Sequence, residues 1–170
     1  MSGDNHQPIT LVLDTNVVID WLVFDDPFMR PLRDGVRDEG VKVFTHAYAT
    51  TELKRVLAYP QLKLTIARQR EIFSRYQVET TIAQMPDDYS PKHLMLPGGF
   101  PRCRDRDDEP FLALAFHAKV DALASRDNAV FGLKTRVEKY GVAILNVPQL
   151  IAMLTEKLAV PPDLEVQIKH

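Results

Sequence analysis

The feature that most constrains the fold of this chain is a short apolar run that ends abruptly in an acid. Residues 9–13 are mostly apolar or β-branched, a composition typical of a strand buried on both faces of a sheet. Asp14, Thr15 and Asn16 follow directly, and apolar residues resume from Val17 with helical spacing. An acid that ends a buried strand lies at the edge where α/β proteins build their sites. Asp14 or Asn16 would also suit a simple helix cap, so this feature alone leaves both interpretations open.

Strand and helix patterns alternate along the rest of the chain. Further strands are predicted at 41–44, 79–85, 120–125 and 142–145, and helices at 17–24, 25–39, 45–59, 64–78, 110–118, 129–140 and 147–158. This alternation favours a parallel sheet with right-handed crossovers. The predicted fold class is therefore α/β, a three-layer α/β/α sandwich with a central parallel sheet of four to five strands. The length of 170 residues fits a single domain, 1–158, followed by a tail, 159–170.

Composition narrows the possible chemistry. A single cysteine, Cys103, excludes an internal disulfide and a thiolate zinc cluster. No apolar run approaches the roughly 20 residues that a membrane helix needs, and the polar stretch 1–8 lacks a signal-peptide core. We therefore expect a cytoplasmic protein that does not contact a membrane. The net charge of −2 does not indicate nucleic-acid binding, but a local basic surface would suffice beside an acidic, metal-binding site.

Two further acids are expected at the same edge as Asp14. Glu52 lies beside the apolar stripe of the predicted helix 45–59, where a carboxylate is unfavourable unless something pairs with it. Asp127 follows the predicted strand 120–125, just as Asp14 follows the first strand. The carboxyl ends of parallel strands share one edge of the sheet, so these acids should converge there. A surface ion pair with a neighbouring basic side chain is the alternative for Glu52.

The most charged stretch of the chain ends a long irregular loop. This loop, 86–106, contains four prolines and two adjacent glycines, and loops of such length in compact domains are usually functional or mobile. Four acids then fall within 105–109, and Asp107 or Asp108 is expected to cap the helix that starts at Pro110. The remaining acids would repel one another unless a cation lies among them. Carboxylates gathered in this way are the ligands that hard divalent cations prefer.

These acidic motifs, in this order, resemble the four acidic blocks of the PIN-domain ribonucleases. The resemblance covers residues 9–155 and is closest to the branch described as VapC-like toxin components of toxin–antitoxin pairs. The segments that carry it are Asp14-Thr15-Asn16, Thr51-Glu52-Leu53-Lys54-Arg55-Val56-Leu57, Arg104-Asp105-Arg106-Asp107-Asp108 before Phe111-Leu112-Ala113-Leu114-Ala115, and Ser125-Arg126-Asp127. Each segment is a weak signal alone, whereas four in order are specific. The loop 86–101 departs from the family pattern because it is longer than the usual connection, which bears on substrate choice.

The resemblance implies hydrolysis of RNA phosphodiester bonds with one or two Mg²⁺ or Mn²⁺ ions. The catalytic, metal-holding acids match four residues of this chain: Asp14, Glu52, Asp108 and Asp127. Asp14 and Asp127 would be the principal ligands. The supporting positions match two residues that would orient the ligands and two alternative registers of the third block: Asn16, Ser125, Asp105 and Asp107. The RNA-binding candidates are basic residues that flank the acidic motifs, although each would also suit an ordinary surface charge: Lys54, Arg55, Arg104 and Arg126.

The same resemblance implies three partners, which are an RNA substrate, a small antitoxin protein that blocks the cleft, and a second copy in a homodimer. Three alternatives stay open. A haloacid dehalogenase-type phosphatase also opens with a strand that ends in Asp, but it needs a second acid where Asn16 stands. A receiver-type phosphoacceptor is shorter and leaves the acidic block unexplained. A non-catalytic PIN-fold module that binds RNA or protein has no need of four mutually repelling carboxylates.

Overall fold

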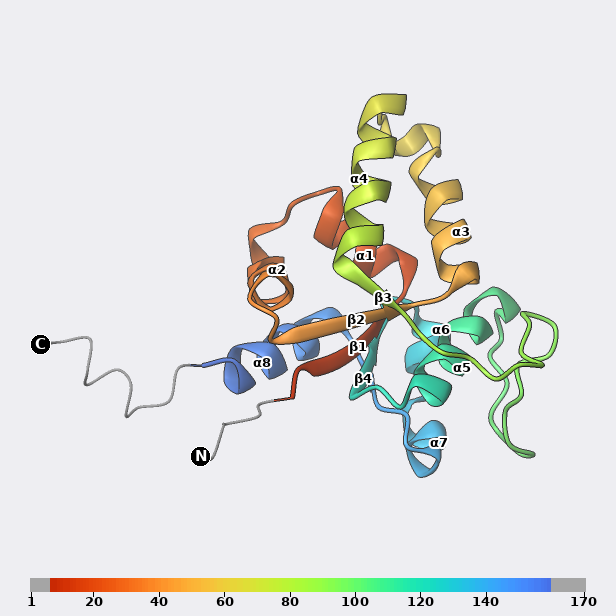
Figure 1. The fold of residues 1–170 in the computed structure, drawn as a ribbon. Helices are drawn as coiled ribbons and strands as arrows, with labels where there is room; N and C mark the ends of the chain where they lie inside the picture. The colour runs from red at the N-terminus through yellow and green to blue at the C-terminus, as the bar shows by residue number, and fades with distance from the viewer. Residues whose placement is uncertain (1–6, 160–170) are drawn as a thin grey trace, which may run out of the picture.

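A computed structural model describes residues 7–159, and its centre is a five-stranded sheet in which all strands run parallel (Figure 1). The strands are β1 (Ile9–Leu13), β2 (Val41–Thr45), β3 (Thr80–Ile82), β4 (Ala122–Ala124) and β5 (Ile144–Leu145). Their order across the sheet is β3-β2-β1-β4-β5, so the first strand lies in the middle. The predicted α/β class, with a central parallel sheet of four to five strands, is confirmed.

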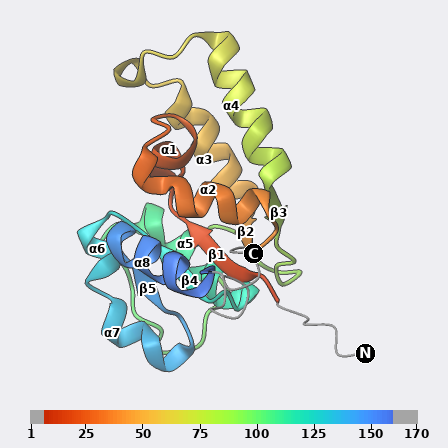
Figure 2. The same cartoon turned by 90° about the vertical axis from the view of Figure 1, so that its left-hand side faces the viewer.

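Three helices pack on one face of the sheet and face the viewer in Figure 2. They are α1 (Thr15–Leu22), α2 (Arg30–Arg37) and α8 (Val147–Lys157). The helix predicted over 25–39 begins later than expected. Asp26 caps a 3-10 turn, Pro27–Met29, because its side chain accepts a hydrogen bond from Phe28 N, and α2 starts only after this turn.

Other helices cover the opposite face. They are α5 (Glu109–Ala118), α6 (Asn128–Phe131) and α7 (Lys134–Val137). The single helix predicted over 129–140 is wrong, because the chain breaks at Gly132 and Leu133 and ends in a 3-10 turn, Glu138–Tyr140. Glycine weakens a helix interior, and Leu133 is drawn into the core on this face.

The central strand is buried on both faces, as its apolar run predicts. Leu11 and Leu13 enter the core beneath α1, α2 and α8, whereas Val12 joins the core beneath α5. The strand β4 is filled in the same alternating way. Because the side chains of both strands are occupied by packing, Asp14 and Ser125, directly after them, are the first polar side chains at the sheet edge.

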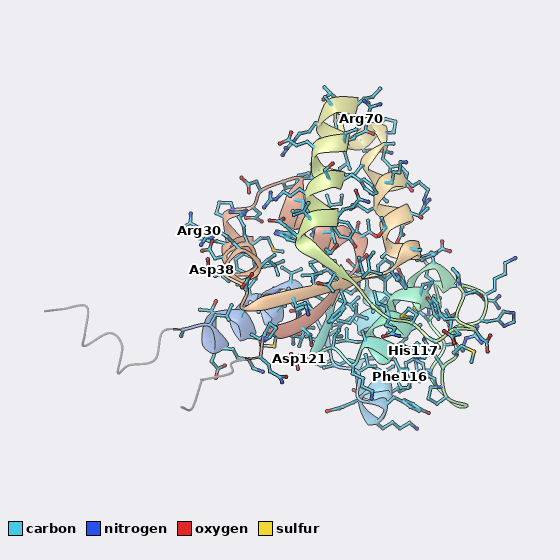
Figure 3. The ribbon with its side chains drawn as sticks, in the orientation of Figure 1. Arg30, Asp38, Arg70, Phe116, His117 and Asp121 are labelled. Carbon is cyan, nitrogen blue, oxygen red and sulfur yellow. The ribbon has the colours of Figure 1, made fainter. Side chains whose placement is uncertain are left out.

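Two longer helices form a hairpin that extends beyond the sheet (Figure 1). They are α3 (Ala47–Leu57) and α4 (Ile66–Glu79), joined through a 3-10 turn, Pro60–Leu62. Leu57 of α3 and Ile72 of α4 are buried and belong to the core beneath α1, α2 and α8. The hydroxyl of Tyr76 forms a 2.6 Å hydrogen bond with Thr45 Oγ1, which fixes α4 to the end of β2. Arg70 lies near the far end of the hairpin (Figure 3).

The long loop after β3 is irregular, as predicted, but it is anchored to α5. Residues 83–105 hold one isolated bridge, between Ser90 and His93, and no helix. Nε2 of His117 lies 2.8 Å from the carbonyl oxygen of Leu94. The ring of Phe100 packs against that of Phe116, with centroids 5.8 Å apart. Figure 3 places Phe116 and His117 on the side of α5 that this loop covers.

Two predicted segments lie at the ends of the chain. Of the predicted tail, 159–170, all but Ala159 lies outside the described residues. The polar stretch 1–8 is described only from Gln7 onward. Between these limits, no helix combines the length and the apolar character needed to cross a membrane.

Candidate metal centre

The candidate site begins with Asp14, which follows β1 and is only 6% exposed. Its Oδ1 accepts a hydrogen bond from Val17 N at 3.1 Å, so Asp14 caps α1. Its Oδ2 accepts from the Ser125 hydroxyl and from the backbone N of Arg126, at 3.3 Å in the latter case. Burial raises the pKa of Asp14, and these hydrogen bonds oppose that rise. Helix cap and sheet-edge acid are therefore the same residue.

Ser125 and Asp127 follow β4 in the way that Asp14 follows the neighbouring β1. The strands are in register, with Leu13 opposite Ala124, so their ends meet. The Ser125 hydroxyl donates to Asp14 and accepts from Asp127 N at 3.0 Å. Asp127 caps α6, because its Oδ1 accepts from a backbone N–H of that helix at 2.8 Å. Ser125 thus links two segments that carry predicted acids, Asp14 and Asp127.

Glu52 reaches the site from α3. Thr15 Oγ1 donates to Glu52 Oε2 at 2.9 Å, and Arg55 Nη2 lies 3.7 Å from Oε1. Burial raises the pKa of Glu52, although the hydrogen bond from Thr15 and the charge of Arg55 oppose the rise. The ion pair that was the surface alternative for Glu52 is therefore present, and it lies at the site itself.

The acidic block enters from the long loop through a 3-10 turn, Arg106–Asp108. Asp105 Oδ1 accepts from Asp107 N at 2.9 Å and caps this turn, whereas Asp108 makes no side-chain capping bond to α5. Asp108 occupies the N-cap position of α5, as the prediction of Asp107 or Asp108 allows, but its side chain accepts no capping hydrogen bond. The extra turn before α5 has its own cap, Asp105. Asp107 is exposed, and its carbonyl oxygen accepts from the Tyr48 hydroxyl at 3.0 Å.

Asp108 is the least satisfied acid of the site. Its Oδ2 is buried and has no hydrogen-bond partner among residues 7–159. Asp105, Asp108 and Asp127 each offer an oxygen, and these three oxygens lie within 4.8 Å of one another. Burial raises the pKa of Asp108 to about 8, and two effects of Asp127 add to the rise: a hydrogen bond that favours the protonated Asp108 carboxyl, and like-charge repulsion. Such a group becomes fully charged near neutral pH only when a cation offsets its neighbours.

The structure brings the four predicted metal-holding acids together. One cleft of about 210 Å³ is lined by all of them, from four separate segments of the chain: Asp14, Glu52, Asp108 and Asp127. Asn16 also lines this cleft, with its side chain exposed. The tightest grouping of acids, however, includes Asp105 rather than Asp14. This differs from the sequence assignment, in which Asp14 and Asp127 are the principal ligands.

The predicted RNA-binding residues do not all lie at the acid cleft. Arg55 lines the acid cleft. Lys54 instead lies over an aromatic ring of α4, with Nζ 5.9 Å from the ring centroid. Arg126 is held by Asp20, because its Nη1 donates to both carboxylate oxygens at 2.9 and 2.8 Å. Arg104 is exposed and lines a different hollow.

Two supporting residues have roles that the sequence did not indicate. Thr15 orients Glu52, a contact across 37 sequence positions with no local signal beyond a hydroxyl beside Asp14. His46 caps α3, because its Nδ1 accepts from Ala49 N, and its Nε2 lies 3.1 Å from the Pro110 carbonyl oxygen. It therefore joins the start of α3 to the start of α5. Burial lowers the pKa of His46, which keeps this link neutral.

The donor set fits a hard divalent cation. The cleft presents carboxylate oxygens, which Mg²⁺ and Mn²⁺ prefer. The cysteine of the chain, Cys103, is buried and does not line the cleft. The unpartnered Oδ2 of Asp108 is an acceptor that an ion beside Asp105 and Asp127 would satisfy. Hydrogen bonds from Ser125 and Thr15 fix two other acids from behind, as ligand-orienting groups do.

Comparison with known proteins identifies the family. A family model described as PIN domain matches residues 10–129. No curated protein matches the chain significantly. The matched region runs from β1 into α6 and contains all four acids of the cleft, at the strand ends and helix starts described above. Because this match covers more than half of the sequence, the chain belongs to the PIN domain family.

Proposed function

We propose that this protein is a ribonuclease that hydrolyses RNA phosphodiester bonds with one or two Mg²⁺ or Mn²⁺ ions, and that it is the toxin of a toxin–antitoxin pair. PIN domains are in general metal-dependent nucleases, and this chain carries the acidic cluster that such chemistry needs. The observation that carries the proposal is the buried, unpartnered oxygen of Asp108 beside Asp105 and Asp127. The family assignment also disfavours the phosphatase and receiver alternatives.

The acids divide into two roles. Asp105, Asp108 and Asp127 would hold a divalent ion, and Asp14 and Glu52 would hold a second ion or its water. When bound, such ions neutralise the phosphate, activate water and stabilise the leaving oxygen. This division gives Asp105 a larger part than its position in the sequence motif suggests.

Several groups of the chain prepare the site for this reaction. Ser125 holds the Asp14 carboxylate in one orientation, and Thr15 does the same for Glu52. Within residues 7–159, Glu52 Oε1 accepts no hydrogen bond and has Arg55 Nη2 at 3.7 Å, and the pKa of Glu52 is raised by burial. Glu52 is therefore suited to accept a proton at Oε1 from the attacking water. Arg55, which lines the cleft beside Glu52, would then contact the RNA phosphate that is cleaved.

The proposed toxin role implies an antitoxin partner, a homodimer and a cytoplasmic location. An antitoxin would block the acid cleft by placing a basic side chain among the acids. A homodimer is supported by two exposed aromatic residues near the start of α2, Phe24 at 59% and Phe28 at 48% exposed. Trp21, the other aromatic residue of this region, is fully buried and is unavailable for such a contact. We expect the protein in the cytoplasm.

The proposal is tested with purified protein and single-stranded RNA. The wild-type protein should cleave RNA with Mn²⁺ or Mg²⁺, lose cleavage in EDTA, and regain it when the metal is restored. Asp14→Asn should be inactive, while Asp88→Asn, at an exposed loop position, should match the wild type. RNA binding without cleavage in either metal would favour a non-catalytic module instead. Turnover of para-nitrophenyl phosphate would favour the phosphatase.

A further inference from the structure

A second hollow, of opposite charge, lies beside the acid cleft. It has a volume of about 460 Å³ and is lined by Arg102, Arg104 and Arg136, and we call it the arginine pocket. No acid is among the described residues that line it. Arg104 directly precedes Asp105, and Asn128, also in the lining, directly follows Asp127. The arginine pocket therefore adjoins the acids of the candidate metal centre.

Arg102 is fixed in this pocket by a buried carboxylate. Its Nε donates to Glu109 Oε2 at 2.9 Å, and its Nη2 lies 3.4 Å from Oε1. The side chain of Glu109 is 5% exposed, whereas that of Arg102 is 73% exposed. Glu109 thus needs Arg102 as its partner, and the pair leaves Nη1 of Arg102 outside the fork. The guanidinium is held in place before any ligand arrives.

The other two arginines have no such partner. Arg104 and Arg136 are exposed, and neither forms an ion pair within the part of the chain that the structure describes. The guanidinium groups of Arg104 and Arg136, which share this hollow, repel one another unless an anion lies between them. A guanidinium fork matches the geometry of phosphate oxygens, with which it forms short, strong hydrogen bonds.

We propose that the arginine pocket binds a backbone phosphate of the RNA strand next to the phosphate at the acid cleft, an inference that rests on the proposed ribonuclease function. The phosphate at the cleft would be neutralised by the metal ion, but its neighbours along the strand would not. A strand that passes Asp105 and Asp127 continues past Arg104 and Asn128, where the pocket opens. Arg136, in α7, completes this pocket and belongs to none of the acidic motifs.

The test measures RNA binding by Arg136→Gln in the non-cleaving Asp14→Asn protein with Mn²⁺. The matched control is Arg70→Gln, at the far end of the α3–α4 hairpin (Figure 3). We expect Arg136→Gln to bind a short single-stranded RNA about tenfold more weakly than the parent, because a charge-assisted hydrogen bond is lost. The salt dependence of log K should also become shallower by about 0.7 per lost phosphate contact. Arg70→Gln should leave both quantities at the parent values.

A length series separates a phosphate subsite from a general charge effect. The parent should gain affinity when a dinucleotide is extended, and Arg136→Gln should gain much less. Arg136→Lys, which keeps the charge but not the fork, should recover part of the affinity. Thermal unfolding of each variant confirms that it is folded.

Three outcomes would overturn the inference. The first is equal RNA affinity and salt dependence for Arg136→Gln and Arg70→Gln. The second is an unchanged gain on extending the dinucleotide. The third is weaker binding of polyglutamate, but not of RNA, by Arg136→Gln, which would assign the pocket to an acidic protein partner. If the arginine effect holds while the wild-type protein cleaves no RNA, the ribonuclease proposal fails and the pocket remains an RNA site.

Discussion

The two halves of the candidate metal centre differ in how far hydrogen bonds within the fold satisfy their carboxylates. In the sheet half, made of Asp14 and Ser125, the oxygens of Asp14 accept three hydrogen bonds. In the loop half, made of Asp105, Asp108 and Asp127, one buried oxygen has no partner within residues 7–159. Burial raises the pKa of an acid in both halves, but hydrogen bonds oppose the rise at Asp14, whereas neighbouring carboxylates add to it at Asp108.

This difference indicates a division of labour. The carboxylate of the sheet half is fully hydrogen-bonded without a ligand, so this half holds the rest of the site in a fixed position. The loop half is electrostatically incomplete, and a divalent cation would remove its repulsion. Stability should therefore depend on the sheet half, and metal affinity on the loop half.

The largest expected effect is in the loop half. Asp108→Asn should weaken Mn²⁺ binding and RNA cleavage by more than about 100-fold, since even groups that only orient ligands contribute 10- to 100-fold. The same variant should raise the melting temperature of the metal-free protein, because it removes a buried carboxylate from between two others. Asp88→Asn is the matched control for calorimetry, cleavage and thermal unfolding. A variant that loses stability but keeps metal affinity would reverse the assignment of the two halves.

The sheet half should show the opposite behaviour. Ser125→Ala removes the hydroxyl that donates to Asp14 and accepts from Asp127 N. We expect a loss of about 1–3 kcal/mol in the free energy of unfolding, measured in urea, because buried partners are left unsatisfied. Ser74→Ala, at an exposed position of α4, should change stability little. An unchanged unfolding free energy for Ser125→Ala would mean that the hydrogen bonds of the sheet half do not stabilise the fold.

The pH dependence of the metal-free protein tests the same contrast. Asp108 has a pKa of about 8 in the folded state against an ordinary value of 3.8, so the folded protein binds the extra proton between these values. Its stability should therefore fall as pH rises from about 5 to 8, and Asp108→Asn should flatten this slope. His46 acts in the other direction. Its pKa is lowered from 6.5, so its contribution is lost as pH falls below that value.

Thermal unfolding at several pH values separates the contribution of Asp108, which is lost as pH rises, from that of His46, which is lost as pH falls. His46→Gln should remove the decline at low pH and leave the decline at high pH. A metal-free wild-type protein that gained stability steadily from pH 5 to 8 would contradict the raised pKa of Asp108.

The smallest expected effect concerns Thr15. Thr15→Val keeps the shape of the side chain but removes the hydrogen bond to Glu52. We expect a loss of about 0.5–1.5 kcal/mol in unfolding free energy, and only a few-fold loss of metal affinity. Thr135→Val, at an exposed position of α7, is the control. A loss of metal affinity as large as that of Asp108→Asn would place Glu52 among the principal ligands.

Local patterns explain why most of the fold could be predicted. The run 9–13 is apolar on both faces, so a central strand followed by an acid was predictable from adjacent residues alone. The break at Gly132 was missed because the apolar spacing of 129–140 continues across it. Arg136, which lines the arginine pocket, belongs to the short helix after the break.

The detail of the candidate site depends on contacts that sequence spacing does not encode. The acidic block allows several registers, and only the extra 3-10 turn decides that Asp105 makes a capping hydrogen bond while Asp108 is half-buried with its Oδ2 enclosed. Arg126 looks like an RNA-binding residue beside Asp127, but it pairs with Asp20, which is 106 positions away. Residue type identified the acids, and tertiary packing decided the role of each.

The most direct test of this division is a calorimetric titration of the metal-free protein with Mn²⁺ at pH 7, in two buffers of different protonation enthalpy. Asp108 is largely protonated at this pH, so we expect each protein molecule to release about one proton on binding metal. The released proton should be absent in Asp108→Asn. Binding of Mn²⁺ without proton release, or no binding at millimolar concentrations, would contradict a loop half that is completed by a cation.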